Sequence, residues 1–199
     1  YGFCFARRGT EIHAILVGHE GEVRQFVLTA DAAGQPAARE VRRFDIGTIS
    51  EGCAADEATD ALYLGEENVG VWRYRLDPTA GAERTLVQGI ARDLLVADAE
   101  GLTIIADGAA RYLIGSSQGD SAFPVWRIDG AGPEYKGRFV VEDGVVDGVT
   151  GTDGLAAMGG AVGGFPEGVV VVQDDVNDVG TQNFKYIDWR VIKAALGLD

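Results

Sequence analysis

The chain has few cysteines, few histidines and a deficit of basic residues, and it has no long apolar run. Stretches such as residues 169–172 are typical of its longest apolar runs, far below the roughly 18 residues of a membrane span, so we expect no membrane insertion. The net charge of −14 disfavours nucleic acid, which binds basic surfaces. Cys4 and Cys53 are spaced wrongly for a zinc knuckle, which leaves a disulfide in an exported protein or two buried thiols in a cytosolic one.

Glycine is the residue type in clear excess. The chain has 29 glycines among 199 residues, roughly twice the usual share of about 7%, which favours many tight turns over long helices. Hydrophobic residues make up 46%, too many for a disordered chain. The chain opens on Tyr1-Gly2-Phe3 without an initiator methionine, so we expect it to be processed or cut from a longer protein.

A short motif recurs four times at a spacing of about 50 residues. It consists of a polar or aromatic residue, a glycine and an apolar residue. Each motif is followed by an apolar strand that ends in polar groups, within residues 15–19, 62–67, 112–118 and 169–174. Two units then repeat an aromatic strand, at 71–74 and 125–128. The four copies are Tyr1-Gly2-Phe3, Glu51-Gly52-Cys53, Glu100-Gly101-Leu102 and Asp153-Gly154-Leu155.

Several short strands per repeat, with no helix-length pattern between them, are typical of β-propeller blades. The sequence therefore predicts a single all-β domain over residues 1–199, a propeller with about four four-stranded blades. The period alone does not decide whether they form a small ring or part of a larger one. A short C-terminal helix is predicted over Trp189–Leu196, capped by Asp188 and ended by Gly197. A helix within residues 89–110 is disfavoured by Gly101 and the β-branched run that follows it.

Acidic and amide side chains occupy related places in successive repeats. They flank the repeated glycine or follow the next strand, and a propeller would bring such positions to one mouth of its channel. Carboxylates that meet there repel one another unless a cation is present, and oxygen ligands without histidine or cysteine clusters suit calcium. The alternative is that these acids cap turns and face water. The residues are Glu51, Glu67, Asp98, Glu100, Gln118 and Asp153.

No familiar catalytic or nucleotide-binding motif accompanies these acids. The chain has no G-x-S-x-G nucleophile elbow and no EF-hand loop. Its glycine-rich stretch 159–164 lacks the lysine of a P-loop. The metal prediction therefore rests on the repeat.

Seven segments together resemble the β-propeller phytases in order and spacing, and they cover nearly the whole chain. Those most specific to that family are 98–104 and 116–119. The resemblance implies a six-bladed phosphatase, secreted in most members, that needs several calcium ions and hydrolyses inositol hexakisphosphate (phytate). The segments are residues 1–3, 51–57, 64–67, 97–104, 116–119, 147–148 with 152–154, and 182–185.

Position by position, the resemblance implies seven calcium ligands, bound directly or through water, and two contacts to substrate. Tyr1 and His19 would touch phosphate, with His19 standing where the family has a lysine. The implied mechanism is attack on phosphorus by a metal-activated water. The residues that act through that water would be Glu51, Glu67, Asp98 and Glu100. The implied calcium ligands are Glu51, Glu67, Asp98, Glu100, Gln118, Asp147 and Asp153.

The chain departs from the family pattern chiefly in what it lacks. A family aspartate near Gly151 is absent, and so are the upstream aspartate-rich and asparagine-aspartate-arginine motifs. Six blades at this period need more than 199 residues, so a missing N-terminal segment or a second chain would complete the propeller. The expected partner is a small molecule, phytate as its calcium complex, because bound calcium inverts the local sign of an acidic surface.

Two other functions stay open. A calcium-dependent propeller lactonase or esterase also places metal in a carboxylate-lined channel. A non-catalytic propeller that binds protein partners would use calcium only to hold its blades together. The phytase reading also implies a secreted or periplasmic protein, because calcium is millimolar outside the cell and a Cys4–Cys53 disulfide between adjacent inner strands would form there.

Overall fold

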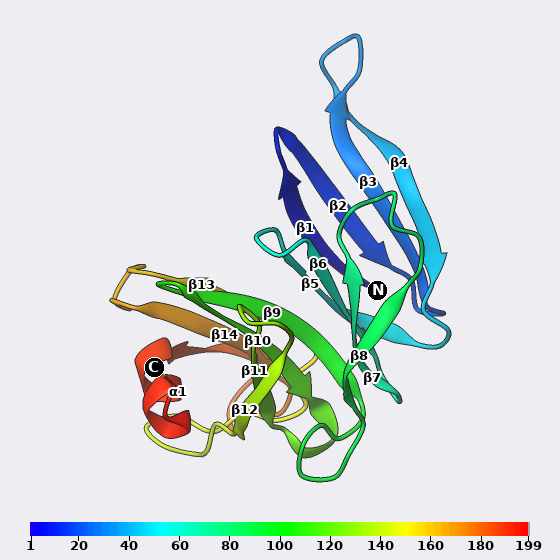
Figure 1. The fold of residues 1–199 in the computed structure, drawn as a ribbon. Coiled ribbons are helices and arrows are strands. Elements are labelled where there is room, and N and C mark those ends of the chain that lie inside the picture. Colours follow the sequence, from blue (N-terminus) through cyan, green and yellow to red (C-terminus); the bar gives the residue numbers. More distant parts are fainter. Residues whose placement is uncertain (199) are drawn as a thin grey trace.

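The repeats fold into four antiparallel sheets that follow one another round an arc (Figure 1). The computed structural model describes residues 1–198. The first sheet consists of β1 (Gly2–Arg8), β2 (Glu11–Val17), β3 (Glu22–Ala30) and β4 (Pro36–Asp45). The second consists of β5 (Ser50–Asp56), β6 (Ala61–Glu66), β7 (Gly70–Arg75) and β8 (Arg84–Gly89). The third consists of β9 (Ala99–Asp107), β10 (Ala110–Ser117), β11 (Phe123–Arg127) and β12 (Glu134–Phe139). The fourth consists of β13 (Leu155–Gly159), β14 (Gly168–Asp174) and β15 (Asn183–Asp188).

The predicted all-β propeller is confirmed, with one correction to the last blade. Each predicted repeat strand is the second strand of its sheet, and residues 89–110 form no helix. The fourth sheet has three strands, where the sequence predicted four-stranded blades. After β15 the chain turns into the helix α1 (Trp189–Leu196), which buries Trp189 and Ile192 against the third and fourth sheets. The apolar face of this segment therefore packs as a helix and adds no outer strand.

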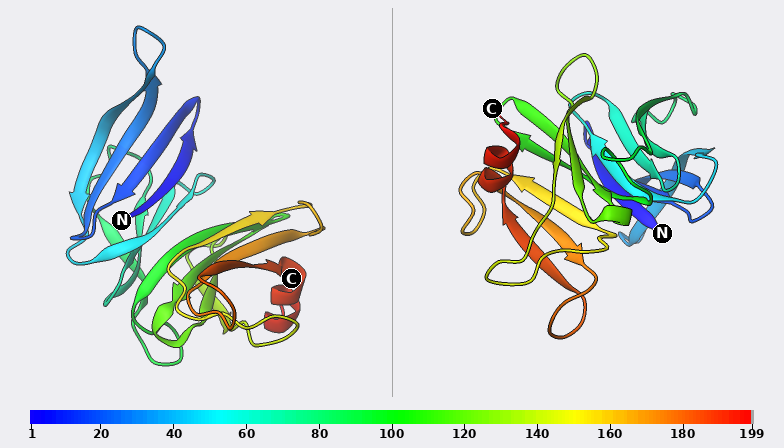
Figure 2. Two further views of the ribbon diagram at one scale, coloured as in Figure 1. Left: turned by 180° about the vertical axis from the view of Figure 1, so that it is seen from behind. Right: turned by 90° about the horizontal axis from the view of Figure 1, so that it is seen from below.

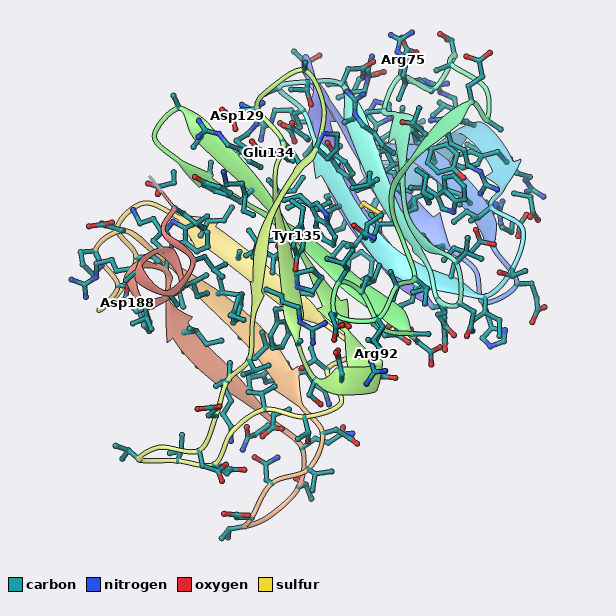
Figure 3. All side chains as sticks on the ribbon, turned by 60° about the horizontal axis from the view of Figure 1, so that its bottom comes forward. Arg75, Arg92, Asp129, Glu134, Tyr135 and Asp188 are labelled. Carbon is teal, nitrogen blue, oxygen red and sulfur yellow. A yellow bond between two sulfur atoms is a disulfide. The ribbon has the colours of Figure 1, made fainter. Side chains whose placement is uncertain are left out.

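The helix α1 begins and ends where the sequence predicts. The Asp188 carboxylate (labelled in Figure 3) accepts a hydrogen bond from the Arg190 N–H at 3.0 Å. Gly197 has a φ of 61°, and its N–H bonds to the Lys193 carbonyl, so a left-handed residue closes the helix. No helix among residues 1–198 is long and apolar enough to cross a membrane.

The repeated glycine lets the first strands of successive sheets pack together. β1 contacts β5, β5 contacts β9 and β9 contacts β13, so these strands line the inside of the arc. A Cβ at Gly2 would lie 1.8 Å from the Glu51 carbonyl oxygen, and one at Gly52 would lie 2.3 Å from that of Glu100. At Gly101 the same contact, to Asp153, would be 2.5 Å. Only glycine permits this approach, which explains the period of the sequence.

Three apolar cores lie between the four sheets. Ile15 and Leu64 belong to the core between the first and second sheets. Leu113 and Trp126 belong to the core between the second and third. Val170 joins the core between the third and fourth. The first and last sheets lie at opposite ends of the arc (Figure 2), so each has one face without a neighbouring sheet.

We expect Gly52→Ala to destabilise the fold and Gly154→Ala to leave it nearly unchanged. A Cβ at Gly52 would also lie 2.9 Å from Leu102 Cγ, so both backbone and side chain of the next sheet would have to move. Overpacking of this kind costs about 1–3 kcal/mol. Nothing lies within 4 Å of a Cβ at Gly154, which makes that variant the matched control. Thermal unfolding is the measurement, and equal melting temperatures for the two variants would contradict the packing role.

Candidate metal centre

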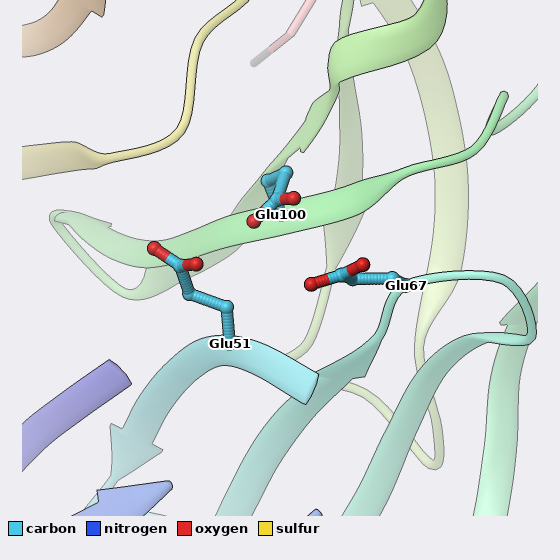
Figure 4. Close-up of side chains that lie close together, drawn as sticks. All are labelled: Glu51, Glu67 and Glu100. Carbon is cyan, nitrogen blue, oxygen red and sulfur yellow. The ribbon is translucent and has the colours of Figure 1, made fainter. Parts of the chain in front are cut away.

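Three glutamates from the second and third sheets point toward one another at one mouth of the arc (Figure 4). Glu51 lies in β5, Glu67 directly follows β6, and Glu100 lies in β9. One carboxylate oxygen of each lies within 4.8 Å of the others. The exposed fraction is 7% for Glu67 and 5% for Glu100, so this is a buried cluster of like charges.

Backbone hydrogen bonds between the two sheets fix the strand ends that carry these side chains. The Glu67 N–H bonds to the Ile49 carbonyl at 3.0 Å, which ties the end of β6 to the start of β5. The Ala99 N–H bonds to the Glu67 carbonyl at 2.9 Å, which ties the same turn to the start of β9. The repeat therefore delivers its polar positions to one place through main-chain contacts.

Burial and repulsion raise the pKa values of all three glutamates. The pKa of Glu100 is raised to about 8, first by burial and then by the charges of Glu51 and Glu67. Burial is also the largest cause of the raised pKa of Glu51, followed by the charge of Asp153. For Glu67, burial comes first and the charge of Asp98 second. Glu100 therefore holds a proton near neutral pH in the absence of a cation.

The donor set fits a hard divalent cation. Glu67 Oε1 and Glu100 Oε2 are buried and have no hydrogen-bond partner among the residues that the structure describes. A buried carboxylate oxygen without a partner is costly, and a cation would remove that cost for both residues together. Carboxylate and amide oxygens without histidine or cysteine are the ligands that calcium prefers.

Two predicted ligands from the third and fourth sheets complete one side of the mouth. Asp98, just before β9, acts electrostatically on Glu67 and Glu100. Asp153, just before β13, acts on Glu51 and Glu100. Gln118 Nε2 donates to Asp153 Oδ1 at 2.6 Å. Electrostatic effects and one hydrogen bond thus connect these three residues to the three glutamates, whose carboxylate oxygens lie within 4.8 Å of one another.

Asp147, the seventh predicted ligand, lies in a different group. Its Oδ1 accepts from Lys185 Nζ at 2.7 Å, and this contact is the main reason why the pKa of Asp147 is lowered. Lys185 Nζ also lies 3.0 Å from Asp174 Oδ2. Among the contacts that the structure describes, Asp147 has none with the three glutamates. Lys185 lies in segment 182–185, which belongs to the family resemblance, but its pairing with Asp147 was not predicted from the sequence.

Tyr1 and His19 lie together at the rim of the cluster. Their rings meet edge to face with centroids 4.8 Å apart. The Tyr1 hydroxyl bonds to Glu67, whose charge is the leading electrostatic cause, after burial, of the raised pKa of Tyr1. His19 Nδ1 lies 2.6 Å from Glu20 Oε1. Tyr1, Glu51 and Asp153 line a cavity of about 200 Å³ that opens at this rim.

Gln173 is a site residue that was not predicted from the sequence. It lies at the end of β14, and its Oε1 accepts from the Asp153 N–H at 2.8 Å. Thr152 Oγ1 donates to the Gln173 carbonyl at 2.7 Å, so Gln173 holds the segment before β13 through its side chain and its backbone. The available signal was the repeat itself, since Glu67 and Gln118 follow the corresponding strands.

A disulfide joins Cys4 of β1 to Cys53 of β5, with Cα atoms 5.5 Å apart (Figure 3). Of the two alternatives that the sequence left open, the structure has the disulfide. It links the first strands of the first two sheets, directly beside the motif that carries Glu51. The mouth of the arc is therefore braced covalently on its N-terminal side.

We expect the unreduced, unfolded protein to contain no free thiol, and the reduced protein to be less stable by about 2–4 kcal/mol. The loop closed by the bond spans 49 residues, so reduction frees much of the unfolded chain. Thiol titration in denaturant and thermal unfolding with and without reductant are the measurements. A double variant, Cys4→Ala with Cys53→Ala, is the control and should not respond to reductant. A count of two free thiols would refute the bond.

Comparisons with known proteins point to one family. The family model described as Phytase matches residues 1–199. A 3-phytase of Bacillus subtilis (strain 168) is 33% identical over 206 residues, which cover 99% of this chain and 54% of that protein. The chain therefore spans about half the length of this curated relative.

Solved structures show the same fold at low identity. A GH43_1 enzyme from Xanthomonas citri has a TM-score of 0.56 at 14% identity and covers 93% of this chain and 68% of that one. Its complex with xylotriose has a TM-score of 0.57 at 15% identity and covers 93% and 67%. These similarities concern the fold alone. The family model and the Bacillus relative decide the family: this chain belongs to the phytases.

Proposed function

We propose that this chain carries the calcium centre of a phosphomonoester hydrolase that releases phosphate from phytate. The observation that supports this most directly is the buried cluster of Glu51, Glu67 and Glu100 in a chain of the phytase family. The B. subtilis relative is a 3-phytase, which supports phytate as the substrate class. In a site lined by carboxylates, bound cations would offset the repulsion between those carboxylates and the phosphates of the substrate.

The calcium ligands of the proposal are the residues that the structure brings to the mouth. Asp147 would join them only by leaving Lys185. The chemistry that bound calcium would supply is neutralisation of the substrate's phosphate charge and activation of water for in-line attack on phosphorus. The proposed ligands are Glu51, Glu67, Asp98, Glu100, Gln118 and Asp153.

Tyr1 and His19 are proposed to bind a substrate phosphate at the rim. Both are more than half exposed, and their edge-to-face contact holds one ring against the other beside Glu67. The Tyr1 hydroxyl and a neutral imidazole N–H can each donate to a phosphate oxygen. His19 would orient a phosphate through a hydrogen bond.

We propose that further blades, from an additional N-terminal segment or a second chain, cover the two open ends of the arc. Phe3 and Phe5 on β1 are 63% and 57% exposed, and Phe184 and Tyr186 on β15 are 64% and 66% exposed. Aromatic side chains in rows on a sheet face are normally buried. At Gly2, Gly52 and Gly101 a carbonyl of the next sheet lies against the glycine, whereas nothing lies within 4 Å of a Cβ at Gly154. The first strand of a further blade could therefore pack against Gly154.

Export is proposed as well, to the periplasm or the outside of the cell. The Cys4–Cys53 disulfide suits an oxidising compartment. A cluster of carboxylates that needs calcium suits a compartment where that ion is millimolar.

Assays of three substrate classes test the proposed reaction. The protein that contains this chain should release phosphate from phytate in calcium and should leave lactones and carboxylic esters unchanged. Hydrolysis of a lactone without phosphate release would favour the lactonase alternative. If calcium stabilises the protein but no substrate is hydrolysed, the result would favour the non-catalytic binding propeller with a structural metal.

A further inference from the structure

The proposed calcium centre depends on two loop segments that need support of their own. Asp98 lies directly before β9, at the end of one loop, and Asp153 lies just before β13, at the end of the other. Their side chains share one negatively charged region with the three glutamates, so like charges repel one another there in the absence of a cation. Some other contact must hold both loops in place.

Ser117, the last residue of β10, holds the first of these loops. Its side chain is 0% exposed. The hydroxyl oxygen accepts from the Val96 N–H at 2.7 Å, and the hydroxyl donates to Asp120 Oδ1, also at 2.7 Å. The Val96 carbonyl oxygen lies 3.2 Å away as an alternative acceptor. Ser117 therefore hydrogen-bonds the backbone of Val96, which lies two residues before Asp98.

Gln118 and Gly119 hold the same loop from the next two positions. The Gln118 N–H donates to the Asp98 carbonyl at 3.0 Å. A Cβ at Gly119 would lie 1.9 Å from the Ala97 carbonyl oxygen, so the loop lies directly against the backbone here. Any side chain at Gly119 would push Ala97 and Asp98 away.

Ser116 holds the second loop. It is 2% exposed, and its hydroxyl donates to the Thr152 carbonyl at 2.6 Å, one residue before Asp153. Gln118 Nε2 reaches the Asp153 carboxylate itself at 2.6 Å. Residues 116–119 thus contact both loops, and neighbouring serines serve different loops because successive side chains of a strand point to opposite faces.

We propose that Ser116 and Ser117 are positioning residues, which act through the backbone to place Asp153 and Asp98 for calcium. The proposal rests on the proposed calcium centre. Calcium takes oxygen ligands at about 2.3–2.6 Å, so a loop that relaxes outward loses a ligand even though every ligand residue is still present. Loss of a residue that supports metal ligands commonly lowers the affinity for the metal by about 10–100-fold.

Calcium titration calorimetry of two alanine variants tests the proposal. Ser117→Ala should bind calcium about tenfold more weakly than the native protein, and Ser117→Thr, which keeps the hydroxyl, should recover affinity. Ser116→Ala tests the other loop and should weaken binding in the same way. It also keeps the proposal testable if Ser117→Ala does not fold. Melting temperatures in chelator report the loss of stability separately.

The matched control is Thr103→Val. Thr103 is a buried hydroxyl residue of β9 whose Oγ1 accepts from the Ala157 N–H at 3.0 Å, so this variant also loses one hydrogen bond to a neighbouring strand. It should lower the melting temperature and leave calcium affinity unchanged. If Ser117→Ala and Ser116→Ala behave like Thr103→Val, their role is structural only and the proposal is overturned.

Failure of the proposed function gives a different result. The native protein would then bind calcium and release no phosphate, while the difference in affinity between Ser117→Ala and Thr103→Val would stay as proposed. A native protein that binds no calcium would overturn the metal centre and the positioning role together.

Discussion

Replacement of Glu100 by glutamine is expected to weaken calcium binding and phosphate release by about a hundredfold or more. Glu100 is the most buried of the three clustered glutamates, and the charges of four other acids act on it. Glutamine has almost the same shape, so the change removes a charge and one carboxylate ligand while it leaves the packing intact. The loss is expected in calcium affinity first, because the cluster would have one anionic ligand fewer.

The same variant should be more stable than the native protein when calcium is removed. Without a cation, Glu100 must either take up a proton or repel its neighbours, and the amide of Gln does neither. Glu100→Gln should therefore have the higher melting temperature in chelator at alkaline pH and the smaller rise on addition of calcium. Glu83→Gln, an exposed acid between β7 and β8, is the control and should change neither quantity. A native-like calcium response of Glu100→Gln would contradict the assignment.

Alkaline pH is expected to destabilise the calcium-free protein and to strengthen calcium binding. The pKa of Glu100 is raised to about 8 in the folded state, against about 4.3 in an unfolded chain. The folded state therefore keeps a proton that the unfolded state releases. This contribution to stability is fully present below about pH 4 and is lost as the pH rises through about 8.

Calcium is expected to reverse the sign of this dependence, because it would bind the ionised carboxylates and displace the proton. Affinity should rise by up to about tenfold per pH unit as the pH approaches 8 from below, if one proton is released. Melting temperatures from pH 6 to 9, in calcium and in chelator, measure both effects. The gap between the two curves should widen with pH in the native protein and widen less in Glu100→Gln, which keeps only Glu51 and Glu67 as clustered glutamates with raised pKa values. A constant gap in the native protein would show that no carboxyl group with a raised pKa takes part in calcium binding.

The sequence predicted the features that every repeat needs. A glycine is required wherever the first strands of two sheets pack backbone to backbone, so Gly2, Gly52 and Gly101 mark the period. Successive blades of a propeller are related by a rotation about the central channel, so equivalent positions of each blade lie at the same end of that channel. Acids beside the repeated glycine and at the ends of the second strands were therefore expected to lie close together. Glu51, Glu67 and Glu100 follow from this reasoning without any knowledge of long-range contacts.

Features that occur only once could not be predicted in this way. The helix Trp189–Leu196 was predicted from its caps, but the repeat predicted a fourth strand for every sheet and so missed that the last sheet stops at three strands. Asp147 resembles the other acids in sequence, but Lys185, 38 residues away, meets it in space. The paired action of Ser116 and Ser117 on two loops likewise depends on which sheets flank β10.

Phosphate release from phytate, followed through one cycle of calcium removal and return, tests the central claim most directly. The protein that contains this chain should release phosphate in calcium, stop in excess chelator and resume when calcium is restored, while Glu100→Gln should stay nearly inactive throughout. Phosphate release that continues at full rate in chelator would contradict the claim that the carboxylate cluster works by holding calcium.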